Sequence, residues 1–348
     1  MQFHALVIES IQAETDVAVS ISLTVPATLS KIFTWQAGQH VQVKLFINGV
    51  SYIRYYSISQ GQQGHNFSIT VKQQKDGVVS PYLNNQLKQG DLLEVSQPMG
   101  RFCVSAAEKN RKSYYFFTLG SGITPIFNMI NTLLKTEKHS HLYLLYGNKN
   151  HDSAIFCHAL TSLQQQYTDR FTLLECHSNA KWLSSYTPWH FGRIDQQRVQ
   201  AFIREYPPQA HDVEYYLCGT GDFIMQVEQA LMAIDVPNIR IYSEGFTRRT
   251  NIETSCVAAN LQVRINGNKH QLPVAAGQTL LQAMKNKGLN VPYSCEAGLC
   301  GRCRCHLDSG QVDHGQDAFL SEKERAKGDI LACQSTATTS EITISYQK

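Results

Sequence analysis

The sequence Cys-Glu-Ala-Gly-Leu-Cys-Gly-Arg-Cys-Arg-Cys occupies residues 295–305. Its first three cysteines are separated by four and then two residues, and Cys333 follows after 29 further residues. Four thiolates at this spacing are typical of a plant-type [2Fe–2S] cluster, in which one tight loop supplies three ligands and a distant segment supplies the fourth. The predicted cluster ligands are Cys295, Cys300, Cys303 and Cys333.

Small residues surround these cysteines. Gly298 and Gly301 allow the backbone to approach the cluster closely and to offer N–H groups to its sulfides. Zinc sites usually pair their ligands as Cys-x2-Cys on each half of the site, and Cys333 has no such partner. Cys305 fits none of the four ligand positions and is expected to be structural. We therefore prefer the cluster over a zinc site and over a set of inert core cysteines.

Residues 1–108 alternate apolar and polar side chains between short polar turns, for example in Phe-Ser-Ile-Thr-Val-Lys at 67–72. A period of two residues is typical of strands that bury one face. We expect an antiparallel β-barrel, interrupted by one helix that begins near Ser80-Pro81.

Residues 109–246 contain short apolar runs that alternate with helical stretches, which is the pattern of a parallel sheet with crossover helices. The runs lie at 114–119, 141–146, 171–176, 213–218 and 239–243. Ser113 to Leu134 carries no charge and approaches the length of a membrane span, but its Gly, Pro and Asn residues would be costly in lipid. We interpret it as a buried strand, a turn and a helix.

Residues 247–259 lack a clear period and are expected to be a linker. In residues 260–348, Asn266-Gly267 predicts the turn of a hairpin, and a helix is expected from Thr279 to Lys287. The expected fold is therefore a multidomain α/β and β protein, with a barrel, a parallel-sheet domain and a C-terminal β-grasp ferredoxin domain.

The composition limits the class of function. The chain has 348 residues, which suggests two or three domains, and a net charge of +3 without a basic run gives no sign of nucleic-acid binding. The first residues lack the basic and apolar regions of a secretory signal. Ten cysteines in such a chain indicate metal or redox chemistry rather than disulfides. We therefore expect a cytoplasmic protein without a transmembrane segment.

A plant-type cluster accepts one electron at a time, whereas a nicotinamide donates two as a hydride, so a flavin is expected between them. Three segments fit a flavin site: Arg-Tyr-Tyr-Ser at 54–57, Gly-Val-Val-Ser at 77–80 and Pro-Met-Gly-Arg-Phe at 98–102. The second precedes the expected helix, whose first N–H groups favour a pyrophosphate. In this order the segments resemble the flavin-binding motifs of the ferredoxin-reductase superfamily.

The resemblance implies roles for individual residues. Arg54 pairs with the flavin phosphates, Tyr56 stacks on the isoalloxazine ring, and Ser57 hydrogen-bonds near its reactive N5 atom. Gly-Val-Val-Ser resembles the FAD-binding members more than the FMN-binding reductases of dioxygenases, so FAD is the expected flavin and FMN the alternative. The implied cofactor-binding residues of the barrel are Arg54, Tyr56, Ser57, Val71, Lys72, Gly77, Val79 and Ser80.

Three further segments follow strands of the expected parallel sheet, where such sheets bind ligands. They read Gly-Ser-Gly-Ile-Thr-Pro at 120–125, Tyr-Gly-Asn at 146–148 and Cys-Gly-Thr-Gly at 218–221. They resemble the nicotinamide-binding motifs of the same superfamily, with Thr220 in place of a proline, which puts the rigidity of that turn in doubt. The implied nicotinamide-binding residues are Gly120, Gly122, Thr124, Pro125, Gly147, Asn148, Ser178, Cys218 and Gly219.

By the same resemblance, Cys218 lies beside the nicotinamide ring, and Glu244 and Phe246 lie near the flavin at the end of the fifth strand. The expected catalytic residues are Ser57, Cys218 and Glu244. NADPH-dependent members often place Ser-Arg after the third strand to bind the 2′-phosphate, whereas this chain has Ser178-Asn179 followed by Lys181. A lysine supplies a point charge without a planar bidentate contact, so NADH and NADPH both stay open, with NADPH slightly favoured.

The order of the three domains resembles the reductase components of multicomponent oxygenases, in particular the reductase subunits of phenylacetyl-CoA epoxidases. Reductases of hybrid-cluster proteins and of fatty-acid desaturases are similar. The resemblance implies an NAD(P)H:acceptor oxidoreductase that passes electrons through FAD and the cluster to a partner oxygenase, epoxidase or desaturase. Two alternatives remain: a reductase of small acceptors or of a hybrid-cluster protein, and a redox-sensing protein that is not an enzyme.

Overall fold

A computed structural model describes residues 2–179, 191–247, 256–265, 267–293, 298, 301–315 and 319–346. The chain divides into two compact units, Met1–Glu244 and Gly245–Lys348. The first unit contains a barrel core and a separate core against a parallel sheet, and the second unit has a core of its own.

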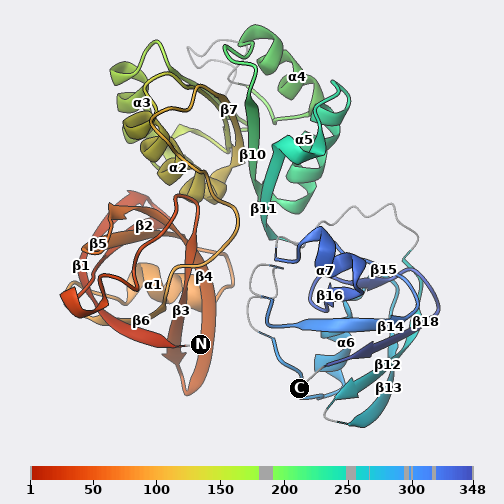
Figure 1. Cartoon of the computed structure of the whole chain (residues 1–348). Coiled ribbons are helices and arrows are strands. Elements are labelled where there is room, and N and C mark those ends of the chain that lie inside the picture. The colour runs from red at the N-terminus through yellow and green to blue at the C-terminus, as the bar shows by residue number, and fades with distance from the viewer. Residues whose placement is uncertain are drawn as a thin grey trace. The chain divides into compact units, whose positions relative to one another are not determined.

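Six strands of the first unit close into an antiparallel barrel in the order β1-β2-β5-β4-β3-β6 (Figure 1). They are β1 (Phe3–Thr15), β2 (Ala18–Thr24), β3 (His40–Ile47), β4 (Val50–Gln62), β5 (Asn66–Lys72) and β6 (Leu92–Ser96). In β5, Phe67, Ile69 and Val71 are fully buried in the barrel core, as a period of two predicts. Helix α1 (Val79–Asn85) packs beside β5. The predicted barrel and its helix are confirmed.

A tight turn sets the register of the two strands that carry the Arg-Tyr-Tyr-Ser segment. Ile47 of β3 pairs with Val50 of β4, and Asn48-Gly49 between them has φ values of 51° and 78°. Two consecutive residues with positive φ are typical of the turn that matches the twist of a two-residue hairpin. This register places His40 directly opposite Ser57.

The second sheet of this unit has five strands in the order β11-β10-β7-β8-β9, and β10, β7, β8 and β9 pair in parallel. The strands are β7 (Ser113–Leu119), β8 (His141–Asn148), β9 (Phe171–His177), β10 (Val213–Thr220) and β11 (Ile241–Thr247). Figure 1 shows α2 (Ile123–Thr136) and α3 (Cys157–Gln166) on one side of the sheet, and α4 (Gln196–Glu205) and α5 (Gly221–Met232) on the other. The predicted parallel sheet with crossover helices is confirmed.

The uncharged stretch from Ser113 to Leu134 forms β7, a single 3-10 turn (Gly120–Gly122) and most of α2. This agrees with the interpretation as strand, turn and helix. Within the part of the chain that the structure describes, no helix has both the length and the apolar character needed to cross a membrane.

The fifth strand of the sheet begins later than its apolar run suggests. Asn238–Arg240 forms a 3-10 turn after Pro237, and β11 covers Ile241–Thr247 instead of 239–243. Glu244 and Phe246 therefore lie within this strand rather than beyond it.

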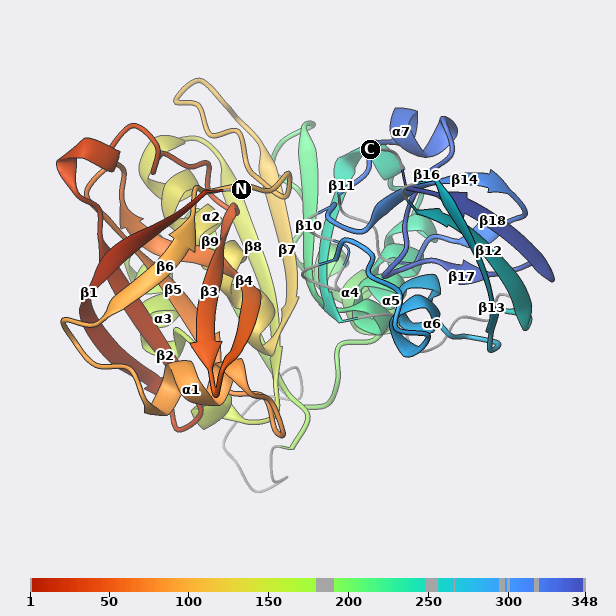
Figure 2. The same ribbon diagram turned by 90° about the horizontal axis from the view of Figure 1, so that it is seen from below.

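The second unit contains a five-stranded sheet in the order β13-β12-β18-β14-β16. Its elements are β12 (Ala259–Ile265), β13 (Asn268–Val274), α6 (Leu280–Asn286), β14 (Arg304–Ser309), β15 (Val312–Asp313), α7 (Glu322–Ala326), β16 (Asp329–Leu331), β17 (Thr336–Ala337) and β18 (Glu341–Ser345). Ile265 pairs with Asn268, so the predicted hairpin is confirmed. Helix α6, which packs on β13 (Figure 2), is capped by Thr279 and Gln282, and this confirms the predicted helix.

One buried hydrogen bond joins the barrel to the helix that follows β7. Asn128 Nδ2 of α2 donates to the carbonyl oxygen of Ile58 in β4 at 2.8 Å. Ile58 directly follows Ser57, so this bond holds α2 beside the Arg-Tyr-Tyr-Ser segment. A buried carbonyl that loses its donor costs about 1–3 kcal/mol.

We predict that Asn128→Ala lowers the free energy of unfolding of the first unit by about 1–3 kcal/mol, because it leaves the Ile58 carbonyl without this donor. Urea unfolding followed by circular dichroism measures the change. Asn131→Ala is the matched control, since the Asn131 amide donates within its own helix, to the Phe127 carbonyl. Equal losses in both variants would contradict a specific role for Asn128.

Candidate functional site

Arg54, Tyr56 and Ser57 lie on β4. The Arg54 side chain is exposed, its Nη1 donates to the neighbouring Ile53 carbonyl at 2.9 Å, and Arg54 forms no ion pair with any described residue. Burial raises the pKa of the Tyr56 phenol, and the Arg54 charge opposes this shift, so the two side chains are close. This pair offers a cation and an aromatic ring face to the same ligand.

Lys72 ends β5 and lies against the loop that follows β7. A Cβ placed on Gly120 would be only 3.6 Å from Lys72 Nζ, and Gly120 has a positive φ of 51°. Burial lowers the pKa of Lys72, and nearby Lys149 lowers it further. Two lysines beside a helix start make this place suited to a phosphate. The Val71 side chain is fully buried in the barrel core, so only its backbone is available to a ligand.

Gly77, Val79 and Ser80 surround the start of α1. Ser80 Oγ accepts a hydrogen bond from the Gln74 backbone N–H at 2.9 Å, so it holds the preceding loop. A Cβ on Gly77 would be 3.2 Å from this hydroxyl oxygen, and Val79 packs in the barrel core. The residue before the helix, Val78, gives no side-chain cap, which leaves the first N–H groups of α1 without a side-chain partner at that position.

The glycine loop after β7 touches the end of β10. A Cβ on Gly122 would be 2.4 Å from the Cys218 carbonyl oxygen and 2.7 Å from Thr118 Oγ1, so a side chain does not fit at this position. Thr118 Oγ1 donates to the same Cys218 carbonyl at 2.9 Å. The structure thus brings together two of the predicted nicotinamide motifs.

The third motif also contacts this loop. The Tyr146 hydroxyl donates to the Gly120 carbonyl at 3.1 Å. Thr124 and Pro125 are buried in the first turn of α2, where Thr124 Oγ1 donates to the Ser121 carbonyl at 3.0 Å. These bonds fix the loop that is expected to meet the dinucleotide.

Gly147 and Asn148 end β8. A Cβ on Gly147 would be 2.4 Å from Leu119 Cδ2, so the end of β8 packs tightly on its neighbour. The Asn148 carbonyl accepts from the Ser178 backbone N–H at 2.9 Å, and the Ser178 side chain is exposed. Lys181, the cation considered for a 2′-phosphate, lies outside the described residues.

Thr220 replaces the proline of the superfamily motif and serves as the N-cap of α5. Its Oγ1 accepts from the Phe223 backbone N–H at 3.4 Å. A Cβ on Gly219 would be 2.9 Å from the Phe223 ring, so this glycine allows the helix to approach the strand end. The turn is therefore held by a helix cap where the superfamily uses a proline.

Glu244 is buried, with 3% of its side chain exposed, and His40 Nδ1 lies 3.7 Å from its Oε1. Burial raises the pKa of the Cys103 thiol to about 12 and that of Cys218 well above its ordinary value. The Glu244 carboxylate adds to both shifts, which means that both thiols are near it. Phe246, two residues further along β11, is partly buried.

Several polar atoms at this point lack partners. The two ring nitrogens of His40 form no hydrogen bond with any described residue, and the same is true of Glu244 Oε2. Buried polar groups usually have a hydrogen-bond partner. His40 lies opposite Ser57 in the register of β3 and β4, so these polar atoms are close to Ser57. A ligand with polar atoms at its edge, such as a flavin ring, would fit beside them. The sequence motifs do not point to His40 or Cys103.

Two of the four predicted cluster ligands, Cys303 and Cys333, are buried and are brought together by strand pairing. β14 pairs with β16 so that Arg304 lies opposite Leu331, and the Ala332 N–H donates to the Cys303 carbonyl at 3.2 Å. Cys333 directly follows Ala332. The other two predicted ligands, Cys295 and Cys300, lie outside the described residues.

The segment around these cysteines suits a compact metal cluster. Gly298 and Gly301 have positive φ values of 76° and 67°, and a Cβ on Gly301 would be 2.2 Å from the Phe319 ring. The Cys305 thiol is fully buried near Tyr346, and this burial raises its pKa. The donor set and the two glycines fit a thiolate-bound iron–sulfur cluster, with Cys305 packed in the core.

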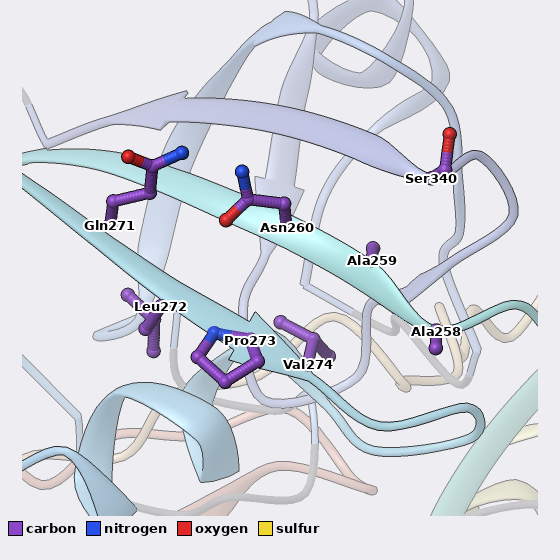
Figure 3. A pocket seen from close by; sticks show the side chains of 8 residues that line it. All are labelled: Ala258, Ala259, Asn260, Gln271, Leu272, Pro273, Val274 and Ser340. Carbon is purple, nitrogen blue, oxygen red and sulfur yellow. The ribbon is translucent and has the colours of Figure 1, made fainter.

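A hollow of about 440 Å³ lies beside β12 and β13 in the same unit. Figure 3 shows its lining, in which the Asn260 and Gln271 amides stand on strands that also carry small and apolar side chains. It contains no cysteine and no charged group. This hollow is therefore separate from the cluster segment.

Family models match three parts of the chain. Residues 6–103 match an oxidoreductase FAD-binding domain, residues 118–229 an oxidoreductase NAD-binding domain, and residues 263–338 a 2Fe-2S iron-sulfur cluster binding domain. The predicted cofactors, FAD, a nicotinamide nucleotide and a [2Fe–2S] cluster, are confirmed at the level of these domains.

Whole-length relatives share this arrangement. One subunit of the 1,2-phenylacetyl-CoA epoxidase of Escherichia coli (strain K12) is 30% identical over 99% of this chain and 98% of its own. The 3-ketosteroid-9-alpha-monooxygenase, ferredoxin reductase component, of Rhodococcus rhodochrous is 28% identical over 98% and 96%. The phthalate dioxygenase reductase structure has the same fold, with a TM-score of 0.61, 22% identity and coverage of 99% and 98%. The chain is therefore an oxidoreductase and belongs to the family of FAD-, NAD- and [2Fe–2S]-binding reductases that includes this epoxidase component of Escherichia coli.

Proposed function

We propose that the chain is the reductase component of an oxygenase system, which takes electron pairs from NADH or NADPH and delivers single electrons to a separate oxygenase. When bound, FAD accepts a hydride and the cluster carries the electrons onward one at a time. The observation that carries this proposal is the convergence of His40, Glu244 and Cys218 beside Ser57. The proposed domains are 1–108 for FAD, 109–246 for the nicotinamide nucleotide, 247–259 as linker and 260–348 for the cluster.

Barrel residues are the proposed flavin ligands. Arg54 and Lys72 bind the phosphates. Arg54 is exposed and forms no ion pair with any described residue. Lys72 lies over the glycine loop at Gly120. Tyr56 offers its ring face, and Ser57 offers its hydroxyl to the ring edge. The first N–H groups of α1 near Gly77 support this role, because they have no side-chain cap.

Glu244 is the proposed proton-holding group. Its unpartnered Oε2 and the nearby His40 ring can hold or release a proton beside Ser57, where charge must be balanced as electrons arrive. The Cys218 thiol stays neutral at ordinary pH because burial and Glu244 raise its pKa, so it fills space and excludes water instead of acting as a thiolate.

The nicotinamide nucleotide is proposed to bind across Gly120, Gly122 and Cys218, with Asn148 and Ser178 at its far end. The close packing of Gly122 on Cys218 supports a single surface for the dinucleotide. Ser178 is exposed at the end of β9 and suits a ribose hydroxyl or a 2′-phosphate. Parallel measurement of KM for NADH and NADPH decides between the two.

The partner is proposed to be an oxygenase. The named relatives serve an epoxidase and a steroid monooxygenase, so the reductase framework itself does not select one substrate. Residues 261–348 carry ten Lys and Arg against eight Asp and Glu, so this domain lacks a strong charge of one sign. We infer docking that depends weakly on ionic strength. No disulfide joins any of the eight described cysteines, which supports a location in the reducing cytoplasm.

The central test is a visible spectrum of the purified protein before and after anaerobic addition of NADH or NADPH. We expect flavin bands and a cluster shoulder that both bleach, and electron transfer to a separately purified partner oxygenase. A protein that contains no iron after anaerobic preparation would refute the proposal. Rapid reduction of quinones with no activation of any oxygenase would instead favour a reductase of small acceptors.

We predict that Glu244→Gln slows reduction of the bound FAD by about 10–100-fold, because an amide can neither take up nor release a proton as the Glu244 carboxyl group is proposed to do. Stopped-flow absorbance at several pH values measures this rate. Glu214→Gln is the control, since Glu214 pairs with Lys112 at the start of the sheet strands. Wild-type rates and an unchanged pH profile for Glu244→Gln would remove Glu244 from the mechanism.

We predict that Lys72→Met raises the Kd for FAD by about 10–100-fold, because a charge-assisted contact to phosphate contributes about 1.5–3 kcal/mol. Fluorescence of released FAD on dilution measures the Kd. Lys75→Met removes an equal charge from an exposed position three residues away and serves as control. A raised KM for NAD(P)H with unchanged FAD binding would assign Lys72 to the nicotinamide site instead.

A further inference from the structure

Three potential metal ligands converge near the carboxyl ends of β8 and β9, outside every residue set assigned above. They are His151, Glu175 and His177, whose ligand atoms lie within 4.8 Å of one another. A fourth, Cys157, contacts His151 and Glu175. Glu175 and His177 alternate on β9 and therefore point to the same face of the sheet. His151 lies in the turn after β8, and Cys157 is the first residue of α3.

Several separations between the ligand atoms are close to those of a metal site, and Cys157 is near enough to complete it. His177 Nε2 is 3.1 Å and His151 Nδ1 is 3.6 Å from Glu175 Oε2. Cys157 Sγ is 3.5 Å from both His151 ring nitrogens and 3.5 Å from Glu175 Oε1. Zinc bonds of about 2.0–2.3 Å at tetrahedral angles place neighbouring ligand atoms roughly 3.3–3.6 Å apart. A small inward movement of these side chains would therefore enclose a zinc ion.

The backbone around the cluster is well fixed. Asn150 and Ser153 form a reciprocal capping box that holds the His151 turn, with the Ser153 N–H donating to Asn150 Oδ1 at 3.0 Å. Phe156 has a positive φ of 62° and stacks on Phe127 with ring centroids 4.2 Å apart. This anchor directs the next residue, Cys157, toward the sheet. Preorganised ligands lower the entropy cost of binding an ion.

The ligand atoms of His151, Cys157, Glu175 and His177 favour zinc over other divalent ions. Two imidazoles, a thiolate and a carboxylate are ligands of zinc, whereas Mg²⁺ and Ca²⁺ prefer oxygen donors only. One thiolate and one carboxylate balance the charge of a divalent ion in this mostly buried place. His151 is 45% exposed and provides an entry path, while His177 is 1% exposed. We propose that His151, Cys157, Glu175 and His177 form a zinc site.

The site would connect two loops that are proposed to meet the nucleotide. The Ser178 and Asn179 N–H groups donate to the Asn148 and Lys149 carbonyls at 2.9 and 2.8 Å, so the loops after β8 and β9 already touch. A zinc ion bound by His151 together with Glu175 and His177 would link the two loops and hold both in place. This consequence rests on the proposed nucleotide site, whereas the metal site itself does not.

The test uses the holoprotein with FAD and iron present. After removal of loosely bound metal with EDTA, and with iron content checked, ZnCl2 is titrated calorimetrically without nucleotide. We expect about one zinc ion per chain, and a Kd raised at least roughly tenfold in His151→Ala. His158→Ala, an exposed histidine next to Cys157, is the matched control and should bind zinc as the wild type does. His177→Gln, checked for folding by circular dichroism, tests a buried ligand.

Each outcome decides the proposal. No stoichiometric zinc binding by the wild type means that the four residues form only a hydrogen-bonded cluster, and the proposal is wrong. Equal affinity in the wild type and His151→Ala also overturns it. If zinc binds as expected but leaves the KM for NAD(P)H unchanged, the link between the site and the nucleotide loops is wrong. If the wild type and all the variants fail to transfer electrons, this result counts against the reductase function and not against the zinc site.

Discussion

The contact of Gly122 with the Cys218 carbonyl, where a Cβ would come within 2.4 Å, is the constraint on which the first unit depends. It forces the loop after β7 against the end of β10, and α2 starts directly from that loop. The direction of α2 then allows Asn128 to donate to Ile58, next to Ser57. Because one glycine fixes this chain of contacts, the barrel and the parallel sheet present their functional residues to the same place.

Electrostatics at that place follow from burial. Glu244 lies between His40 and two thiols, and among the described residues its Oε2 has no hydrogen-bond partner. A buried carboxylate oxygen without a hydrogen-bond donor is costly, so such an arrangement is usually retained for a reason other than stability. A group that can gain or lose a proton without water is useful where electrons arrive and leave.

Local patterns explain which features could be predicted from the sequence. The strands of the barrel and of the sheet follow from periods in the sequence, and the cluster ligands can be recognised because three of them lie within nine residues, 295–303. His40, Cys103 and Asn128 cannot be found in this way, because each meets its partner across a large distance in sequence. The apolar run places the start of β11 too early, because Ile239 alternates with Ile241 as in a strand although Asn238–Arg240 turns after Pro237. The role of Thr220 could not be predicted for a different reason. Its hydroxyl caps α5 only because the chain turns into that helix directly after β10.

The pairing of β14 with β16 has a consequence for how the cluster segment is held. The bonds that bring Cys303 next to the Cys333 segment are backbone hydrogen bonds of the sheet. Helix α6 supports the same segment, because the Leu281 N–H donates to the Ala332 carbonyl at 2.9 Å. Two of the four predicted ligands are therefore positioned by the sheet itself. The residues that keep β14 paired with β16 decide how far apart these two thiols lie.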